Sequence, residues 1–289
     1  MKTLLNKLIA RQDLTETETF DAVSAILAGT MTPAQMGAFL ALLQAKGVAV
    51  AEICGGAAAM RAAARRVQSL QPDTLDTVGT GGDGGMTFNI STTVAFVAAG
   101  AGATVAKHGN RASSGRSGSA DCLEALGLNL KADPEIMEQA LNEIGIAFLF
   151  APTFHQAMRH AGPVRRELGV RTLFNLLGPL TNPAGAPCQL IGVFAPDLTE
   201  AFAHVLQRLG SRRVLVVHGS DGMDEITHGI LTGKITGPKR DIVLINSAAS
   251  LLAANRVASL ADGIAQSAAA IDSGTAYEKL QKLIEYSKM

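Results

Sequence analysis

Two glycine-rich segments have the composition of phosphate-binding loops. Residues 79–83 read Gly-Thr-Gly-Gly-Asp, and residues 107–121 read Lys-His-Gly-Asn-Arg-Ala-Ser-Ser-Gly-Arg-Ser-Gly-Ser-Ala-Asp. Glycine lets backbone N–H groups approach an anion closely, and a loop that leads into a helix places these groups beside the positive end of the helix dipole. Because each segment follows a short apolar run of strand character, the pair predicts a site for a ligand with several phosphates.

Polar side chains near these segments are candidates to bind the same anion. Lys107 directly follows an apolar run and precedes Gly109, so its ammonium could meet a phosphate as a point charge, with a surface lysine as the alternative. Asn89, Ser91 and Thr92 gather side-chain oxygens at a predicted helix start, where the dipole favours anions. Ordinary helix capping uses the same residue types and is the alternative there.

An acidic pair, Asp224-Glu225, follows the predicted strand 214–218 through a glycine-containing loop. Mg²⁺ takes one or two carboxylates and keeps waters and substrate phosphates as its other ligands. The pair therefore predicts a magnesium site beside the phosphate loops, and a solvated acidic turn is the alternative.

Arginine and histidine side chains supply the remaining candidates. Arg165 and Arg166 belong to a predicted helical stretch, 158–168, from which a guanidinium could form a forked pair with a substrate carboxylate. His108 and His155 have no nucleophile or carboxylate at motif spacing, so we interpret them as polar packing or substrate-edge contacts. No catalytic triad is predicted.

The elements that must position these residues fall into two parts. Residues 1–71 have apolar residues at helical spacing, and Thr32-Pro33-Ala34-Gln35 has the pattern of a capping box with proline at the first helical position. After Pro72, helices alternate with short apolar runs that predict strands. The pattern predicts an α/β protein: a small all-helical N-terminal domain, 1–71, and a larger α/β domain, 72–289, with a mainly parallel central sheet flanked by helices. The predicted strands are 75–78, 104–106, 147–150, 190–194 and 214–218.

Composition excludes several classes of function. The 25 basic and 25 acidic residues cancel, so the chain lacks the positive charge typical of a nucleic-acid-binding protein. Cys54, Cys122 and Cys188 are far apart and lack the spacing of a zinc or redox site, which favours free thiols in a reducing cytosol. No stretch has the ~18 uninterrupted apolar residues of a membrane span. We expect a cytoplasmic, soluble protein with no nucleic-acid or membrane partner.

Taken together, the motifs resemble the anthranilate phosphoribosyltransferases of tryptophan biosynthesis, and the resemblance covers essentially the whole chain. It implies a helical domain with a return contribution near 175–187, hinges to the α/β domain, a site in the cleft, and homodimers formed through the helical domain. The motifs stand in the family's order: Gly-Thr-Gly-Gly-Asp (79–83), Asn-Ile-Ser-Thr (89–92), Lys-His-Gly-Asn-Arg (107–111), Ser-Gly-Ser-Ala-Asp (117–121), Val-Arg-Arg-Glu-Leu-Gly (164–169), Asn-Leu-Leu-Gly-Pro-Leu-Thr-Asn-Pro-Ala (175–184) and Gly-Met-Asp-Glu (222–225).

The same resemblance implies the reaction and the residues that perform it. The phosphoribosyl group of 5-phosphoribosyl 1-pyrophosphate would pass to the amine of anthranilate, with Mg²⁺ as the cofactor. The implied catalytic residues are Lys107, Asn110 and Arg165, the implied Mg²⁺ ligands are Ser91, Asp224 and Glu225, and Gly79 joins Asn110 and Arg165 in contacting anthranilate. The substrate-binding residues are Gly79, Gly82, Asp83, Thr87, Asn89, Ile90, Ser91, Thr92, Lys107, His108, Gly109, Asn110, Arg111, Ala112, Ser113, Ser114, Gly115, Ser119, His155 and Arg165.

The chain departs from the family's pattern after Thr227. Family members continue there through a long segment, whereas only residues 228–236 intervene here before Gly237-Pro238, so several dozen residues are predicted to be absent. Two other functions stay open. One is a pyrimidine nucleoside phosphorylase-like enzyme, which has a similar fold and phosphate loop but needs no paired metal carboxylates. The other is a non-catalytic phosphometabolite-binding protein.

Overall fold

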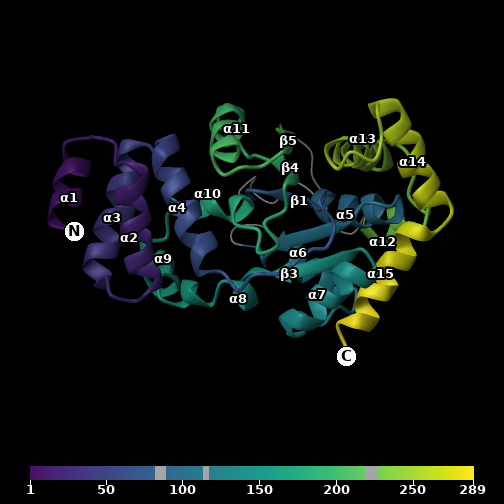
Figure 1. Cartoon of the computed structure of the whole chain (residues 1–289), viewed down its shortest axis with the longest axis horizontal. Coiled ribbons are helices and arrows are strands. Elements are labelled where there is room, and N and C mark those ends of the chain that lie inside the picture. The colour runs from purple at the N-terminus through teal and green to yellow at the C-terminus, as the bar shows by residue number, and fades with distance from the viewer. Residues whose placement is uncertain (82–88, 113–116, 219–226) are drawn as a thin grey trace.

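An N-terminal helical bundle forms one end of the molecule, and an α/β unit forms the rest (Figure 1). The computed structural model describes residues 1–81, 89–112, 117–218 and 227–289. The predicted capping box is present, because the Thr32 side chain accepts from the Gln35 N–H and the Gln35 side chain accepts from the Thr32 N–H. A second box, Thr15 with Glu18, begins the preceding helix and had not been predicted. The bundle helices are α1 (Lys2–Ile9), α2 (Glu16–Leu27), α3 (Pro33–Lys46) and α4 (Val50–Ala63).

The apolar stripe of α3 belongs to the core of this same chain. Met36, Phe39, Leu40 and Leu43 are all buried in one apolar cluster with residues that follow the third strand. Two helices from later in the chain complete the bundle: α9 (Gly162–Leu168) packs on α3, and α10 (Phe174–Leu177) packs on α4. The stripe is therefore occupied within the monomer.

The central sheet has five parallel strands in the order β3-β2-β1-β4-β5, which confirms the predicted α/β class. The strand predicted at 104–106 is longer at its end than expected and includes Lys107 and His108. Their side chains thus start from a strand rather than from a loop. The strands are β1 (Leu75–Gly79), β2 (Val105–Gly109), β3 (Ile146–Phe150), β4 (Cys188–Gly192) and β5 (Arg213–Val217).

A long apolar helix, α5 (Ile90–Gly100), lies between the sheet and the C-terminal helices (Figure 1). Almost all of its side chains are buried, because α12 (Thr227–Leu231), α13 (Pro238–Ala253), α14 (Leu260–Asp272) and α15 (Thr275–Tyr286) pack against it. No helix in the described ranges is long and apolar enough to cross a membrane. The other elements are α6 (Ser119–Ala125), α7 (Pro134–Glu143), α8 (Ala151–Phe154), η1 (Gln156–Arg159), η2 (Gly178–Leu180) and α11 (Leu198–Arg208).

The strand order places a topological switch between β1 and β4. The chain moves from β1 towards β2 and β3 on one side, whereas β4 and β5 lie on the other side. Open α/β sheets bind ligands outside the carboxyl ends of the strands at such a switch. Both glycine-rich segments begin at this edge of the sheet.

Candidate active site

The first glycine segment begins at the end of β1 and is tied to the neighbouring strand. Gly79 pairs with Gly192 of β4, and the Thr80 N–H donates to the Gly192 carbonyl at 2.9 Å. The Phe194 N–H in turn donates to the Thr80 hydroxyl at 3.1 Å. These bonds hold the start of the loop against the end of β4, at the switch point.

The start of α5 links the two glycine segments. Asn89 stands at the N-cap position, but its side chain does not cap the helix. Its amide instead donates to the Ser117 hydroxyl, 3.4 Å away on the second segment. The buried Thr92 hydroxyl has no hydrogen-bond partner among the described residues. Ordinary capping therefore does not account for these side chains.

Lys107 is buried beneath the start of α5 and is only 3% exposed. Its ammonium donates to the Thr77 carbonyl at 2.7 Å and to the Ser91 hydroxyl at 3.2 Å. Burial lowers the pKa of Lys107 to about 8, an effect that the nearby Asp76 carboxylate opposes. The ammonium is thus held in place between β1 and the helix, so it is preorganised to bind an anion.

Asp76 and Asn182 bind the backbone on either side of Lys107, and neither had been predicted to be a site residue. Asp76 is fully buried in β1 and accepts from the His108 N–H at 3.1 Å, while its second oxygen has no partner in the described structure. Burial raises the pKa of Asp76 to about 6, although the positive charge of Lys107 opposes the rise. Asn182 donates to the Ala106 carbonyl at 2.8 Å. A single acidic residue inside an apolar strand was the available signal.

His108 and His155 form a buried pair with ring centroids 5.1 Å apart. The Nδ1 atom of His108 lies 3.2 Å from the Gly178 carbonyl oxygen, whereas the Nε2 atoms of both rings lack partners in the described ranges. Burial lowers the pKa of His108 to about 3 and that of His155 to about 4. Both imidazoles are therefore neutral at pH 7, and each keeps one buried ring nitrogen without a partner among the described residues.

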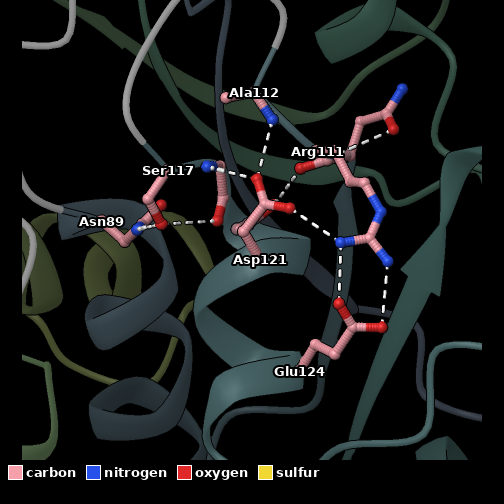
Figure 2. A network of polar contacts seen from close by, with 9 residues as sticks. Asn89, Arg111, Ala112, Ser117, Asp121 and Glu124 are labelled. Atoms are coloured by element: carbon pink, nitrogen blue, oxygen red, sulfur yellow. Dashed lines mark hydrogen bonds and ion pairs between the residues drawn. The ribbon is translucent and has the colours of Figure 1, made fainter.

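The second glycine segment folds back tightly on α6. A side chain at Gly109 would place its Cβ only 2.2 Å from the Ser119 hydroxyl, so the backbone passes where glycine alone fits. The Asn110 carbonyl accepts from both the Ser119 hydroxyl and the Ala120 N–H at 3.2 Å. Arg111 turns towards α6 and pairs with Asp121 and Glu124 (Figure 2). Its guanidinium is thus already held by two carboxylates.

Arg165 lies on α9, half-buried, with its guanidinium 5.3 Å from the centroid of the Phe174 ring. Burial lowers its pKa. No hydrogen bond or ion pair joins this guanidinium to any residue that the structure describes. Its neighbour Arg166 is exposed. A partly desolvated cation without a protein anion is the arrangement expected of a carboxylate-binding residue.

Of the three predicted metal ligands, only Ser91 lies in the described ranges. Its hydroxyl is an oxygen donor of the kind that Mg²⁺ takes, and it lies at the start of α5 beside Lys107. The buried Thr93 and Thr227 hydroxyls are 2.8 Å apart, and Thr227 is two residues beyond Glu225. This bond fixes the point where the chain leaves the acidic pair beside the same helix. Among described residues, no group of three His, Cys, Asp or Glu could hold a metal.

Several predicted residues lie outside the described ranges: Gly82, Asp83, Thr87, Ser113, Ser114, Gly115, Asp224 and Glu225. Most of the predicted site residues that the structure does describe lie near the carboxyl ends of β1 and β2. They are Gly79, Asn89, Ile90, Ser91, Thr92, Lys107, His108, Gly109, Asn110, Arg111, Ala112 and Ser119. His155 joins this group through its contact with His108. Arg165 lies apart on α9 of the bundle, where its guanidinium packs over Phe174.

Comparison with known proteins decides which family this arrangement represents. The profile of the glycosyl transferase family helical bundle domain matches residues 2–64, and that of the family's a/b domain matches residues 71–229. The anthranilate phosphoribosyltransferase of Desulfosudis oleivorans is 49% identical, and that of Moorella thermoacetica is 48% identical; each alignment covers at least 98% of both chains. The chain belongs to the anthranilate phosphoribosyltransferase family.

Crystal structures of anthranilate phosphoribosyltransferases have the same fold over the whole chain. The enzyme from Thermus thermophilus superposes with a TM-score of 0.93 at 40% identity and covers 99% of each chain. The Saccharomyces cerevisiae enzyme in complex with PRPP and Mg superposes with a TM-score of 0.89 at 26% identity and covers 99% of this chain and 97% of that one.

The alignments also bear on the predicted shortening. The D. oleivorans alignment spans 331 positions, whereas this chain has 289 residues, so at least 42 aligned positions have no counterpart here. The match to the a/b domain of the glycosyl transferase family ends at residue 229, two residues after Thr227. The chain therefore lacks a substantial segment that its relative has, and the end of the domain match agrees with the predicted position after Thr227.

Proposed function

We propose that this protein transfers the phosphoribosyl group of 5-phosphoribosyl 1-pyrophosphate (PRPP) to the amine of anthranilate, giving N-(5-phosphoribosyl)anthranilate and pyrophosphate, in tryptophan biosynthesis. The observation that carries the proposal is the match to relatives of this one activity at 49% and 48% identity over nearly the full length of both chains. The nucleoside phosphorylase alternative gains no support from these relatives.

The charges of the site suit displacement of pyrophosphate from C1 of the ribose. The reaction develops positive charge on the sugar and negative charge on the leaving group. Preorganised donors stabilise such charge because they need not reorient during the reaction. Lys107, fixed by Thr77 and Ser91, and the backbone N–H groups of both glycine segments are the donors that we assign to the departing pyrophosphate.

Binding of Mg²⁺ belongs to the proposal, with Ser91, Asp224 and Glu225 as its ligands. When bound, the ion neutralises charge on the pyrophosphate and helps it to leave. The hydrogen bond between Thr93 and Thr227 supports this assignment, because it anchors the chain after the acidic pair beside the helix that carries Ser91. The Saccharomyces cerevisiae relative crystallised with PRPP and Mg is consistent with it.

Anthranilate recognition is assigned to Arg165, Asn110 and the histidine pair. The Arg165 guanidinium lacks an anionic partner among described residues, so it can bind the carboxylate. The aromatic amine is already neutral at pH 7 and becomes acidic once it attacks, so the reaction needs no strong base. Neutral His108 and His155 can therefore serve as hydrogen-bonding contacts at the edge of the substrate without taking up a proton.

A fluorescence assay tests the proposal directly. Anthranilate fluoresces, and the chain contains no tryptophan to interfere. We expect fluorescence to fall only when protein, PRPP and Mg²⁺ are all present. Calorimetry that detects both ligands without any loss of fluorescence would instead identify a non-catalytic binding protein.

Domain division, assembly and location complete the proposal. We propose that the chain divides at residue 71, which the two family matches support by ending at 64 and beginning at 71. We also propose that later residues return to the helical domain, which the packing of α9 and α10 on the bundle supports. We propose a homodimer through the helical bundle, as the family resemblance implies, with an interface that does not use the α3 stripe, because that stripe is buried within the monomer. The free thiols of Cys54 and Cys188 are typical of a reducing compartment and support a cytoplasmic location.

A further inference from the structure

Asp121 gathers three donors from the second glycine segment (Figure 2). One carboxylate oxygen accepts from the Ala112 N–H at 3.0 Å and from the Gly118 N–H at 2.9 Å. The other accepts from the Arg111 guanidinium at 2.8 Å. One oxygen atom thus joins Ala112 and Gly118, which lie in the two flanks on either side of residues 113–116.

The two flanks approach so closely that Gly118 cannot carry a side chain. A Cβ there would lie 2.4 Å from the Ala112 nitrogen and 2.7 Å from the Asn110 carbonyl oxygen. Two backbone N–H groups that converge in this way need a shared acceptor, because an unpaired N–H is costly. The Asp121 carboxylate supplies it.

Arg111 and Glu124 brace this carboxylate from outside. Glu124, one helical turn after Asp121, accepts hydrogen bonds from both terminal nitrogens of the Arg111 guanidinium, at 2.8 and 2.9 Å. Partial burial alone would raise the pKa of Asp121, but the N–H groups of Ala112 and Gly118 and the guanidinium outweigh it, so the pKa lies below its usual value. The Asp121 carboxylate therefore stays charged at neutral pH. We call this carboxylate, with the Ala112 and Gly118 N–H groups and the Arg111 guanidinium that it binds, the clamp.

The clamp reaches predicted substrate-binding residues on both sides. Asn110 directly precedes the Arg111–Ala112 flank, and its side-chain oxygen accepts from the Arg111 N–H at 2.8 Å. On the other flank, Ser117 accepts from Asn89 at the start of α5. Displacing either flank would thus move Asn110 or release Asn89.

We propose that Asp121 is a positioning residue for the PRPP site: its carboxylate fixes the two flanks of the second glycine segment and so holds Asn110 and Asn89 in place for the ligand. This inference rests on the proposed function. Ordinary stabilisation of the start of α6 is the alternative role for Asp121, and it would affect folding without singling out one substrate.

Asp121→Asn tests the clamp, because asparagine keeps the shape but loses the charge and one acceptor oxygen. We expect the KM for PRPP to rise about tenfold or more, as removal of charge-assisted hydrogen bonds implies, and the KM for anthranilate to rise by a smaller factor, because Asn110 shifts but Arg165 keeps its contact with the carboxylate. Asp262→Asn is the matched control: Asp262 also lies in the first turn of a helix and pairs with Ser259 there. An unchanged KM for PRPP, or equal changes for both substrates, would overturn the proposal.

Two further measurements separate this inference from the proposed function. Calorimetry with inorganic pyrophosphate and Mg²⁺ needs no turnover, so weaker binding by Asp121→Asn supports the clamp even if wild type makes no product, and equal binding overturns it. Should Asp121→Asn fail to fold, the exposed brace variant Glu124→Gln decides: a rise of about threefold in the KM for PRPP supports the clamp, and no change overturns it.

Discussion

Removal of the Arg165 guanidinium should weaken anthranilate binding far more than PRPP binding. The group is half-buried on α9, stacks over Phe174 at 5.3 Å, and pairs with no carboxylate in the described structure. Arg165→Ala therefore breaks no ion pair that stabilises the described fold. Its main effect should be to leave the substrate carboxylate without its cation.

The size of the effect on anthranilate binding and on stability follows from two contacts of Arg165, one with the substrate carboxylate and one with the Phe174 ring. A hydrogen-bonded contact between charged groups contributes about 1.5–3 kcal/mol, which corresponds to a rise of roughly ten- to 150-fold in the KM for anthranilate. Loss of the contact with the Phe174 ring should lower the free energy of unfolding by about 0.5–1 kcal/mol. The KM of Arg165→Lys for anthranilate should lie between those of wild type and Arg165→Ala, because lysine keeps the charge but loses the forked geometry.

The loss of anthranilate fluorescence measures both KM values at saturating Mg²⁺. Arg166→Ala is the matched control, since Arg166 is the next residue on the same helix and is exposed. A folded Arg165→Ala with an unchanged KM for anthranilate would refute the assignment. If Arg166→Ala raised that KM instead, the carboxylate contact would belong to Arg166.

Three other predictions concern the buried acid, the metal and the missing segment. The pKa of Asp76 is raised to about 6, so the stability that its protonated carboxyl group contributes is fully present below about pH 4 and is lost as the pH rises through 6. Urea unfolding should show the free energy of unfolding of wild type falling by roughly 3 kcal/mol relative to that of Asp76→Asn over this range. Parallel pH profiles of the two proteins would contradict this. Changing Asp224 and Glu225 together to Ala should abolish turnover at sub-millimolar Mg²⁺, and a wild-type rate with wild-type metal dependence would remove both from the site. Grafting a relative's segment between Thr227 and Gly237 should raise PRPP affinity or turnover, whereas no change in a chain already turning over at ~10 s⁻¹ would make the segment dispensable.

Local pattern was enough to predict the order of the strands, but not the ends of β2 or the helices α8 and α11. The five strands, the long helix after residue 89 and the Thr32 capping box follow from apolar periodicity and turn residues, which act over a few neighbours. Lys107 and His108 looked like loop residues because both are polar. They are strand residues because groups distant in sequence pair with them in the interior. Thr77 and Ser91 accept from the Lys107 ammonium, and Asp76 accepts from the His108 backbone N–H.

The motif residues of the site could be predicted from resemblance, whereas their supports could not. Asp76 and Asp121 act through backbone N–H groups that only the folded chain brings to them. The α3 stripe also shows the limit of sequence patterns, because a buried helix face and an interface have the same periodicity. Packing of α3 against α1 and against the later helix α9 shows that Phe39 and Leu43 are internal.

The strand order also constrains how the chain acquires its structure. Leu75 of β1 pairs with Cys188 of β4, so the edge that holds the first glycine segment needs a contact between residues far apart in sequence. Such contacts form slowly because a long loop must close first. During synthesis, α1 to α4 can assemble from near neighbours, whereas Thr80 must wait for Gly192 to leave the ribosome. The β4 side of β1, which holds the start of the first glycine segment, therefore stays unpaired until about two thirds of the protein has been made.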